Sequence, residues 1–558
     1  MSADAPPQRP RDRRPRPEPQ PPARTPPPAD VVRRRRLVLG AIAAVVVIVA
    51  IVLVIRSCAG GDGETSAPAM GTATAVPAGA LVYLHVSTDR DRAAVTRALR
   101  LARRFGSLAP LRDRLLRGLA SGADRFDYAK DVDPWLGKDV ALAVLAEAGQ
   151  AASSLIIAAV DDRRKARGFL RRTAGTPKRV TYRGTPIDLY GNVATAFAGG
   201  YLVIGPSAAV RAGLDAQSGR RPALAAAPVF RRTIGRLPAD RAADAYASGP
   251  GVRRLIAAQG GLLGVAGTLL DQPGLRGTAI GFSARENGAQ VSVRSDLAPG
   301  ARIAPRSFSP TLDADVPGGA LAYFGTAGFD RTAARLLSAG AAGGLTGPQL
   351  AAALTRLGSD LSTRSGSDVA RDVVGPLKGE VALWFTPAVP APVLTLIART
   401  RDDKATRTAL RRLHGSIRTL LTPPDGSRAA PVFRPLRIAG EQAWSLQLAG
   451  GVRIVYAVFD GRLVISTSPQ GIRAVKQHKR SLADSDTFTT AVGDNPGEVT
   501  SLLFLDFSQL LRLGEQTGLS DNRSYLAVRD DLRRVRAIGA VTSGEETATS
   551  TELFLEIP

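Results

Sequence analysis

The chain has 558 residues, of which 44% are hydrophobic and 5% aromatic, and it carries a formal net charge of +25. This apolar content is sufficient for sizeable cores, while the single cysteine excludes an intramolecular disulfide framework. The positive charge would suit nucleic acid, but the basic residues are scattered and base-stacking aromatic residues are scarce, so we expect no nucleic-acid partner.

The first 36 residues are rich in proline and arginine and show no periodic apolar pattern. A segment of this composition cannot bury enough apolar surface to offset the entropy lost on ordering. We therefore expect residues 1–36 to form a disordered cytoplasmic tail with polyproline II character. Its arginines would contact anionic lipid, and the alternative is a docking peptide for a cytoplasmic partner.

The next 19 positions, residues 37–55, contain no charged side chain. As a helix rising about 1.5 Å per residue they would span roughly 28 Å, close to the ~30 Å hydrocarbon core of a bilayer. Four arginines, Arg33, Arg34, Arg35 and Arg36, precede this run, and an acidic linker follows it. The asymmetry predicts one transmembrane helix with a cytoplasmic N-terminus and extracytoplasmic C-terminal domains in the cell envelope.

Cys58 follows the apolar run and raises the possibility of lipidation. The order Ile55-Arg56-Ser57-Cys58 resembles a bacterial lipobox, in which the cysteine becomes the lipidated N-terminus. Arg56, however, stands where such signals have a small or aliphatic residue, and the apolar run is longer than in cleaved signals. We favour a permanent anchor over a lipoprotein or a simply cleaved signal, with residues 56–75 as a flexible linker.

Beyond the linker the chain repeats itself. VPAGALVYLHV starts at Val76 and VPGGALAYFGT at Val316, and DVDPWLGKDVALAVL from Asp131 returns as DVVGPLKGEVALWFT from Asp372. Further matches follow in the same order along the chain. A repeat of this length predicts an internal duplication of a whole domain.

Copy 1 of this domain would cover residues 76–300 and copy 2 residues 313–558. Strand-like runs joined by short loops alternate with helix-like runs in each copy, and each copy ends on a predicted hairpin, at Glu-Asn-Gly in copy 1. Short connections imply mostly antiparallel pairing. The predicted fold class is α+β, with helices covering one face of a curved antiparallel sheet in each copy.

The YLHV strand, the DVDPWLGKDVALAVL element and the later AGGYLVIG strand resemble a bacterial domain-of-unknown-function family of membrane-anchored envelope proteins. The resemblance covers most of residues 76–558, and PWLGKDVALAV is its most specific part. Copy 2 departs from it, with GPLKGEVALW at the matching place. The resemblance implies a location and an architecture, and it supplies no activity and no catalytic residues.

Catalytic and metal-binding patterns were sought among the few residues able to form them. The three histidines, His85, His414 and His478, have no metal-ligand spacing, and neither a GxSxG nucleophile elbow nor a phosphate-binding loop is present. We expect no catalytic, metal-binding or cofactor-binding residues. His85 as a general base is the remote alternative to a histidine satisfied within its strand.

Charged residues crowd around Trp135 and could suggest a site: Asp131, Asp133, Lys138 and Asp139. In copy 2, Asp131 corresponds to Asp372 and Asp139 to Glu380, but Lys138 corresponds to Gly379, and the shared part is an acidic residue in front of an apolar strand. That comparison favours a structural turn leading into a buried strand.

These observations predict a non-enzymatic, single-pass membrane protein whose duplicated ectodomain binds or scaffolds something outside the membrane. The partner would be an envelope protein, an anionic polymer or a lipid. The alternative function is a carrier of lipid or another hydrophobic ligand, and the third is an envelope hydrolase. An apolar cavity of roughly several hundred Å³ would favour the carrier, and carboxylates clustered at His85 would favour the enzyme.

Overall fold

The structure is a computed structural model of the whole chain. It describes residues 67–68, 70–106, 128–146, 152–256, 274–300, 306–328, 379–388, 392–421, 432–447, 453–493 and 496–558. All of these belong to one compact unit, residues 47–558. We call the described residues up to 300 the first half and those from 306 the second half.

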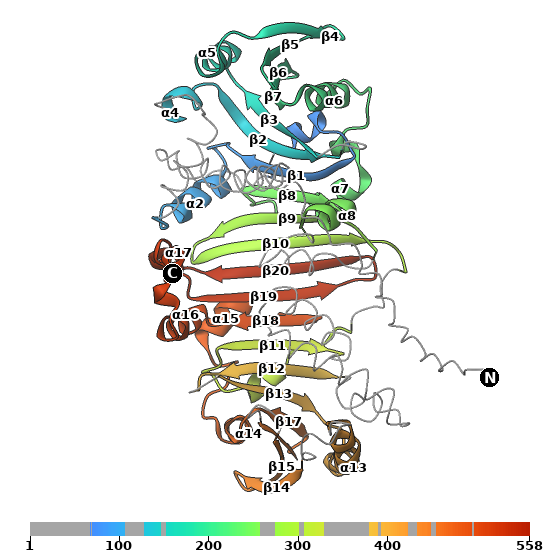
Figure 1. Cartoon of the computed structure of the whole chain (residues 1–558), viewed down its shortest axis with the longest axis vertical. Helices are drawn as coiled ribbons and strands as arrows, with labels where there is room; N and C mark the ends of the chain where they lie inside the picture. Colours follow the sequence, from blue (N-terminus) through green and yellow to red (C-terminus); the bar gives the residue numbers. More distant parts are fainter. Residues whose placement is uncertain are drawn as a thin grey trace, which may run out of the picture. The chain divides into compact units, whose positions relative to one another are not determined.

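The first half contains ten strands, which pair in the order β4-β5-β6-β7-β3-β2-β1-β8-β9-β10 (Figure 1). Their bounds are β1 (Ala80–Ser87), β2 (Leu136–Leu145), β3 (Ser153–Val160), β4 (Lys178–Tyr182), β5 (Thr185–Tyr190), β6 (Val193–Ala198), β7 (Tyr201–Gly205), β8 (Ala243–Ser248), β9 (Leu275–Arg285) and β10 (Gly288–Leu297). Every pair is antiparallel, as the short connections predict.

The second half pairs its strands in the matching order, β14-β15-β16-β17-β13-β12-β11-β18-β19-β20. Their bounds are β11 (Ala322–Ala327), β12 (Glu380–Thr386), β13 (Val393–Arg399), β14 (Phe433–Ile438), β15 (Glu441–Gln447), β16 (Arg453–Phe459), β17 (Arg462–Ser466), β18 (Ser501–Leu505), β19 (Ala537–Gly544) and β20 (Ala548–Glu556).

A central pairing joins the two halves. Strand β10 runs antiparallel to β20, with nine residues of each strand in direct register from Gly288–Glu556 to Asp296–Ala548. The result is a single 20-stranded antiparallel sheet, in which the closing hairpins of the two halves lie side by side (Figure 1). We call the β10–β20 pair the seam.

Helices connect the strands in both halves. In the first half they are η1 (Gly71–Ala75), α2 (Ala93–Ala102), α4 (Tyr128–Asp131), α5 (Arg163–Ala174), α6 (Ser207–Gln217), η2 (Leu224–Ala226), α7 (Pro228–Gly235), α8 (Gly249–Gly251) and η3 (Val252–Ile256). In the second half they are η4 (Leu312–Asp315), α13 (Asp403–Leu421), α14 (Pro469–Gln477), α15 (Asp486–Val492), α16 (Phe507–Gln516), η7 (Leu519–Asp521), α17 (Arg523–Leu526) and α18 (Arg529–Leu532).

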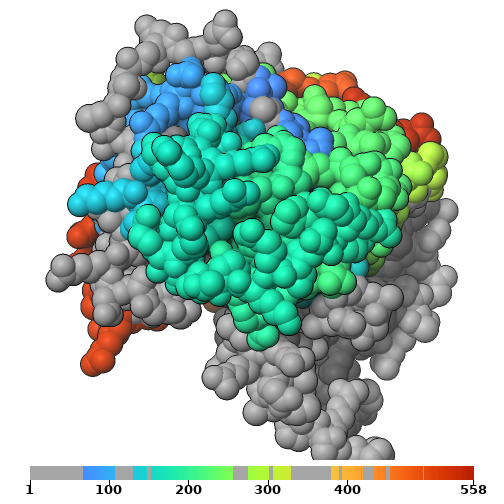
Figure 2. Space-filling view, turned by 90° about the horizontal axis from the view of Figure 1, so that it is seen from above, coloured from blue at the N-terminus to red at the C-terminus, as the bar shows by residue number. Residues whose placement is uncertain are grey.

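Helices pack on both faces of the sheet, which corrects the expectation that they cover one face. In the first half α6 joins the core that contains Leu155 and Val203. Helix α5 packs against Ala158 and Leu202, which point to the opposite face because side chains alternate along a strand. Figure 2 views the sheet from its β4 end and shows the outer part of the first half as space-filling atoms in teal and green.

Two helices of the second half, α13 and α14, are arranged like α5 and α6 of the first. Helix α14 contributes Ile472 to the core that contains Trp384 and Val464, while Leu410 of α13 packs with Leu396 and other residues of the opposite face. We call the face that carries Tyr83 and Tyr323 the core face, and the other the second face. Strands in the outer part of the sheet are therefore covered on both sides.

The last residues of the predicted linker belong to the folded core. Residues 71–75 form η1, in which Thr72, Ala73 and Ala75 are buried, because their small side chains fit against α6 and the sheet. The predicted tail 1–36 and membrane helix 37–55 lie outside the described residues. Within the part of the chain that is described, no helix is long and apolar enough to cross a membrane.

Candidate functional site

A buried charge cluster surrounds His85 in the middle of the first half. Strand β1 lies between β2 and β8, so His85 has a carboxylate from each neighbouring strand within reach. Its Nε2 lies 3.0 Å from Asp139 Oδ1, and its Nδ1 lies 3.3 Å from Asp244 Oδ2. The two carboxylates thus hold the two ring nitrogens of one histidine, which we call the His85 cluster.

Two arginines complete the His85 cluster. Arg241 donates from Nε to Asp244 Oδ2 at 3.0 Å, and Arg92 donates from Nη2 to the carbonyl oxygen of Arg241 at 2.9 Å. The Tyr83 ring lies parallel to the His85 ring, with centroids 6.4 Å apart. The side chains of His85 and Asp244 are both fully buried.

The surroundings of His85 stabilise its charged form. Burial alone lowers the pKa of His85, but the charge of Asp244 and the hydrogen bonds that the ring donates to both carboxylates outweigh it and raise the pKa to about 9. The charges of His85 and Arg241 hold the pKa of Asp244 below its usual value although burial opposes this. The cluster is a buried ion network, and its complete burial separates His85 from any substrate in solution.

The second half does not repeat the His85 cluster. The position that matches His85 on β11 is Gly325, and its partner on β18 is Leu502. Glu380 takes the place of Asp139 in the register but binds elsewhere, accepting hydrogen bonds from the backbone nitrogens of Thr311 and Leu312 at 2.8 and 3.0 Å. The two halves therefore use the same strand positions for different contacts.

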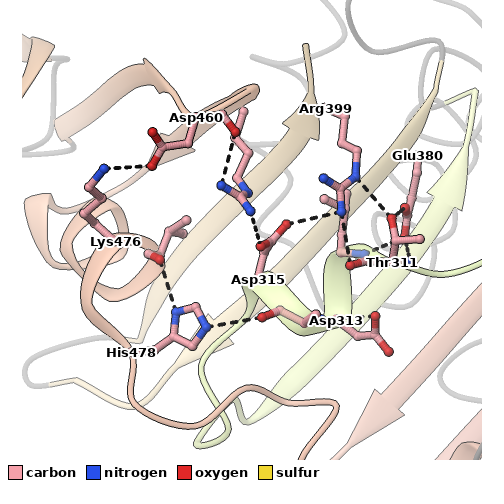
Figure 3. Close-up of polar contacts among 12 residues, drawn as sticks. Thr311, Asp313, Asp315, Glu380, Arg399, Asp460, Lys476 and His478 are labelled. Atoms are coloured by element: carbon pink, nitrogen blue, oxygen red, sulfur yellow. Dashed lines mark hydrogen bonds and ion pairs between the residues drawn. The ribbon is translucent and has the colours of Figure 1, made fainter. Parts of the chain in front are cut away.

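Around η4, the second half has a network of polar contacts that includes Glu380 (Figure 3). Asp315 pairs with Arg462 at 2.7 Å and with Arg399 at 3.5 Å. His478 is partly buried, with its Nε2 3.2 Å from the carbonyl oxygen of Ala314. These contacts tie η4 to the sheet and to the end of α14, which is a structural role.

The charged residues around Trp135 do not converge on one point. Lys138 pairs with Asp89 and Asp91, each at 3.3 Å, and Asp133 pairs with Arg90 at 2.8 Å. Trp135 is buried and donates from its indole nitrogen to the backbone oxygen of Asp131 at 2.7 Å. The carboxylate of Asp131 lies 3.4 Å from Arg172. Only Asp139 of this group turns inward, to His85.

His414, inside α13, belongs to a second cluster, which is made of aromatic rings. Its ring stacks on Phe433 with centroids 3.7 Å apart, and its Nε2 lies 2.5 Å from the hydroxyl of Tyr456. Trp444 meets the same ring edge to face at 4.8 Å. A hollow of about 20 Å³ lies beside these rings, and we call it the aromatic hollow. It is lined by Arg407, Arg411, Gln442, Trp444, Tyr456 and Val458.

A row of apolar side chains crosses the second face in the middle of the sheet. Its members oppose one another directly on eight successive strands, so they share one face. They are Phe282, Val291, Leu553, Ala540, Leu503, Phe324, Leu383 and Leu396. A parallel row beside it contains Leu555, Ile538, Leu505, Ala322, Phe385 and Leu394. We call the two rows together the apolar face.

The apolar face is less deeply buried than the core face. Phe282, Ile538 and Leu555 pack against the cluster formed by α2, and Leu396 packs against α13. All of its members are partly buried or exposed, and Leu503 and Phe385 are 40% and 42% exposed. On the core face of the same strands, Tyr323, Trp384 and Phe504 are almost completely buried. In the central sheet, the core face is thus buried, whereas the second face is partly accessible to solvent.

Several predicted features lie outside the described residues. These are the topology-determining arginines Arg33, Arg34, Arg35 and Arg36 and the possible lipidation site Cys58. Of the histidines, only His85 has carboxylate neighbours on both ring nitrogens. The sequence pattern gave no sign of Asp244, which is 159 positions away, beyond its being a polar residue within the strand run AADAYAS.

A family model matches the chain over residues 37–557, and its description is "Protein of unknown function (DUF3352)". The chain belongs to this family. The family resemblance suggested by the sequence is confirmed at this level, and the description gives no activity for a DUF3352 protein. The match also includes residues 37–55, the segment that carries the predicted anchor.

Comparison with other proteins gives this DUF3352 protein no functional precedent. No curated protein matches it in sequence. Among solved structures it is similar to crystal form I of TP0453, at 14% identity over 42% of this chain and 81% of that chain, with a TM-score of 0.25. Crystal form III of the same protein gives 13% identity, coverages of 41% and 80%, and a TM-score of 0.24. Similarity at this level assigns no function.

Proposed function

We propose that this DUF3352 protein is a non-enzymatic, single-pass membrane protein of the cell envelope that presents a duplicated extracytoplasmic domain as a binding or scaffolding surface. Residues 37–55 are its anchor, and the arginine flank keeps the N-terminus cytoplasmic. Mass analysis of the mature protein tests this part. A diacylglyceryl group on an N-terminal Cys58 would contradict the anchor.

The strand order supports the duplication. Each half pairs its ten strands in the same succession from the outer edge to the seam, and β1 and β11 hold the same place between their neighbours. An η-helix precedes each of these strands, at residues 71–75 and 312–315. Equivalent topology together with the sequence repeat is what a duplicated domain predicts.

The apolar face is the observation on which the binding role rests. Soluble proteins seldom leave a large contiguous apolar surface open, and such surfaces commonly mark sites of interaction. Here the face crosses the seam and contains residues of both halves, Phe282 and Val291 from the first and Leu503 and Phe324 from the second. A ligand or partner that covers it therefore contacts both halves at once.

A carrier of lipid or another hydrophobic ligand is the second candidate, because the same face offers the apolar contacts that an acyl chain needs. The aromatic hollow, at about 20 Å³, is far smaller than the roughly 300 Å³ of a typical ligand pocket. The hollow is thus too small for an acyl chain, and in this proposal a carried lipid lies along the apolar face. The hydrolase alternative would need His85, Asp139 and Asp244 as acid–base groups, and their burial argues against it.

Photo-crosslinking of the full-length protein in its native membrane tests the role of the apolar face. A benzophenone amino acid replaces Leu503 on the face, and in a matched control it replaces Leu510 of α16, a leucine of nearly equal exposure at 39%. We expect adducts at 503 and not at 510. A protein adduct supports scaffolding and a lipid adduct supports the carrier. No difference between the two positions would contradict both.

A further inference from the structure

The aromatic hollow lies where α13 packs over β15 and β16, just beyond the β13 end of the apolar face. Tyr456 of its wall opposes Ile465 of β17, which in turn opposes Leu396 of the apolar face. Arg407 and Arg411, one helical turn apart, lie on the same side of α13 because residues four apart are neighbours on a helix. Trp444 of β15 and Tyr456 of β16 form the wall below them and oppose each other directly in the sheet. The hollow thus brings two guanidinium groups beside a rigid aromatic surface.

Positive charge dominates this hollow. Arg407 donates from Nε and Nη2 to the backbone oxygen of Val458, at 3.0 and 2.8 Å, which fixes its guanidinium at the wall. The carboxylate that pairs with it, Asp403, is 3.9 Å away. Burial, with the charge of Arg411 added, lowers the pKa of the neighbouring His414. A cationic ligand is disfavoured at such a place, and an anion is favoured.

In the first half, the strand position that matches Trp444 carries a carboxylate, and this carboxylate pairs with an arginine of the protein itself. Asp188 opposes Arg179 on β5 and β4 and pairs with it at 2.7 Å. In the second half the equivalent opposed pair is Trp444 and Pro435, on β15 and β14. The second half therefore has an aromatic ring where the first half has a carboxylate, and it keeps its arginines on the helix above.

We propose that the aromatic hollow binds an oxyanion group, a carboxylate or a phosphate, with Arg407 and Arg411 as its cationic contacts and Trp444 as its wall. Guanidinium groups make strong, charge-assisted hydrogen bonds to both kinds of oxyanion. A space of about 20 Å³ holds roughly one water-sized group. One oxygen of the oxyanion would enter the hollow, and the rest of the ligand would remain outside it, beside the exposed Arg411.

The stacked rings give the site its rigidity and a means of detection. Phe433 and Tyr456 hold His414 in place, and Arg411 is the charged group that faces it. An oxyanion bound at the arginines would offset their charge and raise the pKa of His414. Since the chain has only three histidines, each can be followed as a separate resonance by histidine-selective NMR.

The test uses the full-length protein in detergent, labelled at histidine, with inorganic phosphate as the probe and chloride at equal ionic strength as reference. Phosphate is expected to raise the apparent pKa of His414 by about 0.5 or more and to leave that of His85 unchanged. In Arg411→Gln this response should be lost. Arg412→Gln, which removes an exposed charge from the same helix, is the matched control and should keep it.

Further arms identify the source of the oxyanion. Acetate is compared with phosphate, and short-chain phosphatidylglycerol is compared with short-chain phosphatidylcholine below their micelle concentrations. A response to the free anions alone assigns a soluble ligand, and an additional, stronger response to phosphatidylglycerol assigns a lipid head group. Equal His414 titrations in phosphate and chloride, or an unchanged response in Arg411→Gln, would overturn the proposal. Neither outcome bears on the apolar face.

Discussion

At the scale of single residues, the two halves differ most at the position of His85. A buried histidine between two carboxylates stands in the first half, and Gly325 stands at the matching place in the second, where Tyr323 occupies the space a side chain would need. Buried ion networks of this kind often cost as much in desolvation as they return, so they are weak evidence for stability as such. What the His85 cluster does require is a fixed geometry of three neighbouring strands, β2, β1 and β8, because each contributes one of its charged side chains.

The His85 cluster predicts a specific pH dependence of stability. Because the pKa of His85 rises from 6.5 to about 9 on folding, the folded state binds the proton more tightly. This stabilisation is complete below pH 6.5 and is lost as the pH rises through about 9. The free energy of unfolding should fall over this window by up to about 3 kcal/mol, measured by denaturant titration at successive pH values.

His85→Gln should remove this decline, whereas His478→Gln, which changes a partly buried histidine at the end of α14, should keep it. A decline of equal size in all three proteins would show that groups other than His85 cause the pH dependence.

At the scale of secondary-structure elements, close approach between helix and sheet limits substitution. Gly539 of β19 lies directly beneath α15, and a Cβ added there would be 2.1 Å from the backbone oxygen of Ala491. Since no side-chain rotation can relieve a clash with backbone, Gly539→Ala should displace α15 and lower the free energy of unfolding by about 2 kcal/mol. Gly319→Ala, with no atom within 4 Å of the added Cβ, is the control. Equal stability of the two variants in thermal unfolding would contradict the packing described for α15.

Local sequence patterns predicted many of the strands and the β9–β10 hairpin. They did not predict features that depend on contacts between segments far apart in the chain. Alternating and apolar runs identified strands such as β1, β2 and β7, and Glu-Asn-Gly identified the β9–β10 hairpin. The placement of helices on both faces could not be read from these runs, because it depends on which side of the sheet each connection crosses. The partnership of His85 with Asp244 is likewise set by the order β1-β8, a long-range pairing with no local signal. The aromatic hollow unites three elements and was not predicted at all.

At the scale of the whole described unit, the seam turns two similar halves into one sheet. A free β10 or β20 would be an edge strand with unpaired backbone groups and a tendency to aggregate. Pairing the two edges with each other removes both, and it leaves β4 and β14 as the outer strands. The side chain of Glu552 strengthens the seam by accepting hydrogen bonds from Gln290 at 2.7 Å and Ser292 at 2.5 Å. The apolar face exists as a continuous surface only because the seam is formed.

The seam predicts that the two halves unfold together. Nine directly opposed residue pairs join them, so loss of structure in one half removes a sheet neighbour from the other, and calorimetry of the intact protein should show one main transition.

Val291→Pro places a residue without an N–H at the centre of the seam. It should separate the transition into two and weaken crosslinking at position 503, because the apolar face then divides. Val193→Pro, at the start of β6 and far from the seam, should destabilise the first half without uncoupling the second. Two separate transitions in the unsubstituted protein would show that the halves are independent domains, and a binding role that spans them would lose its structural basis.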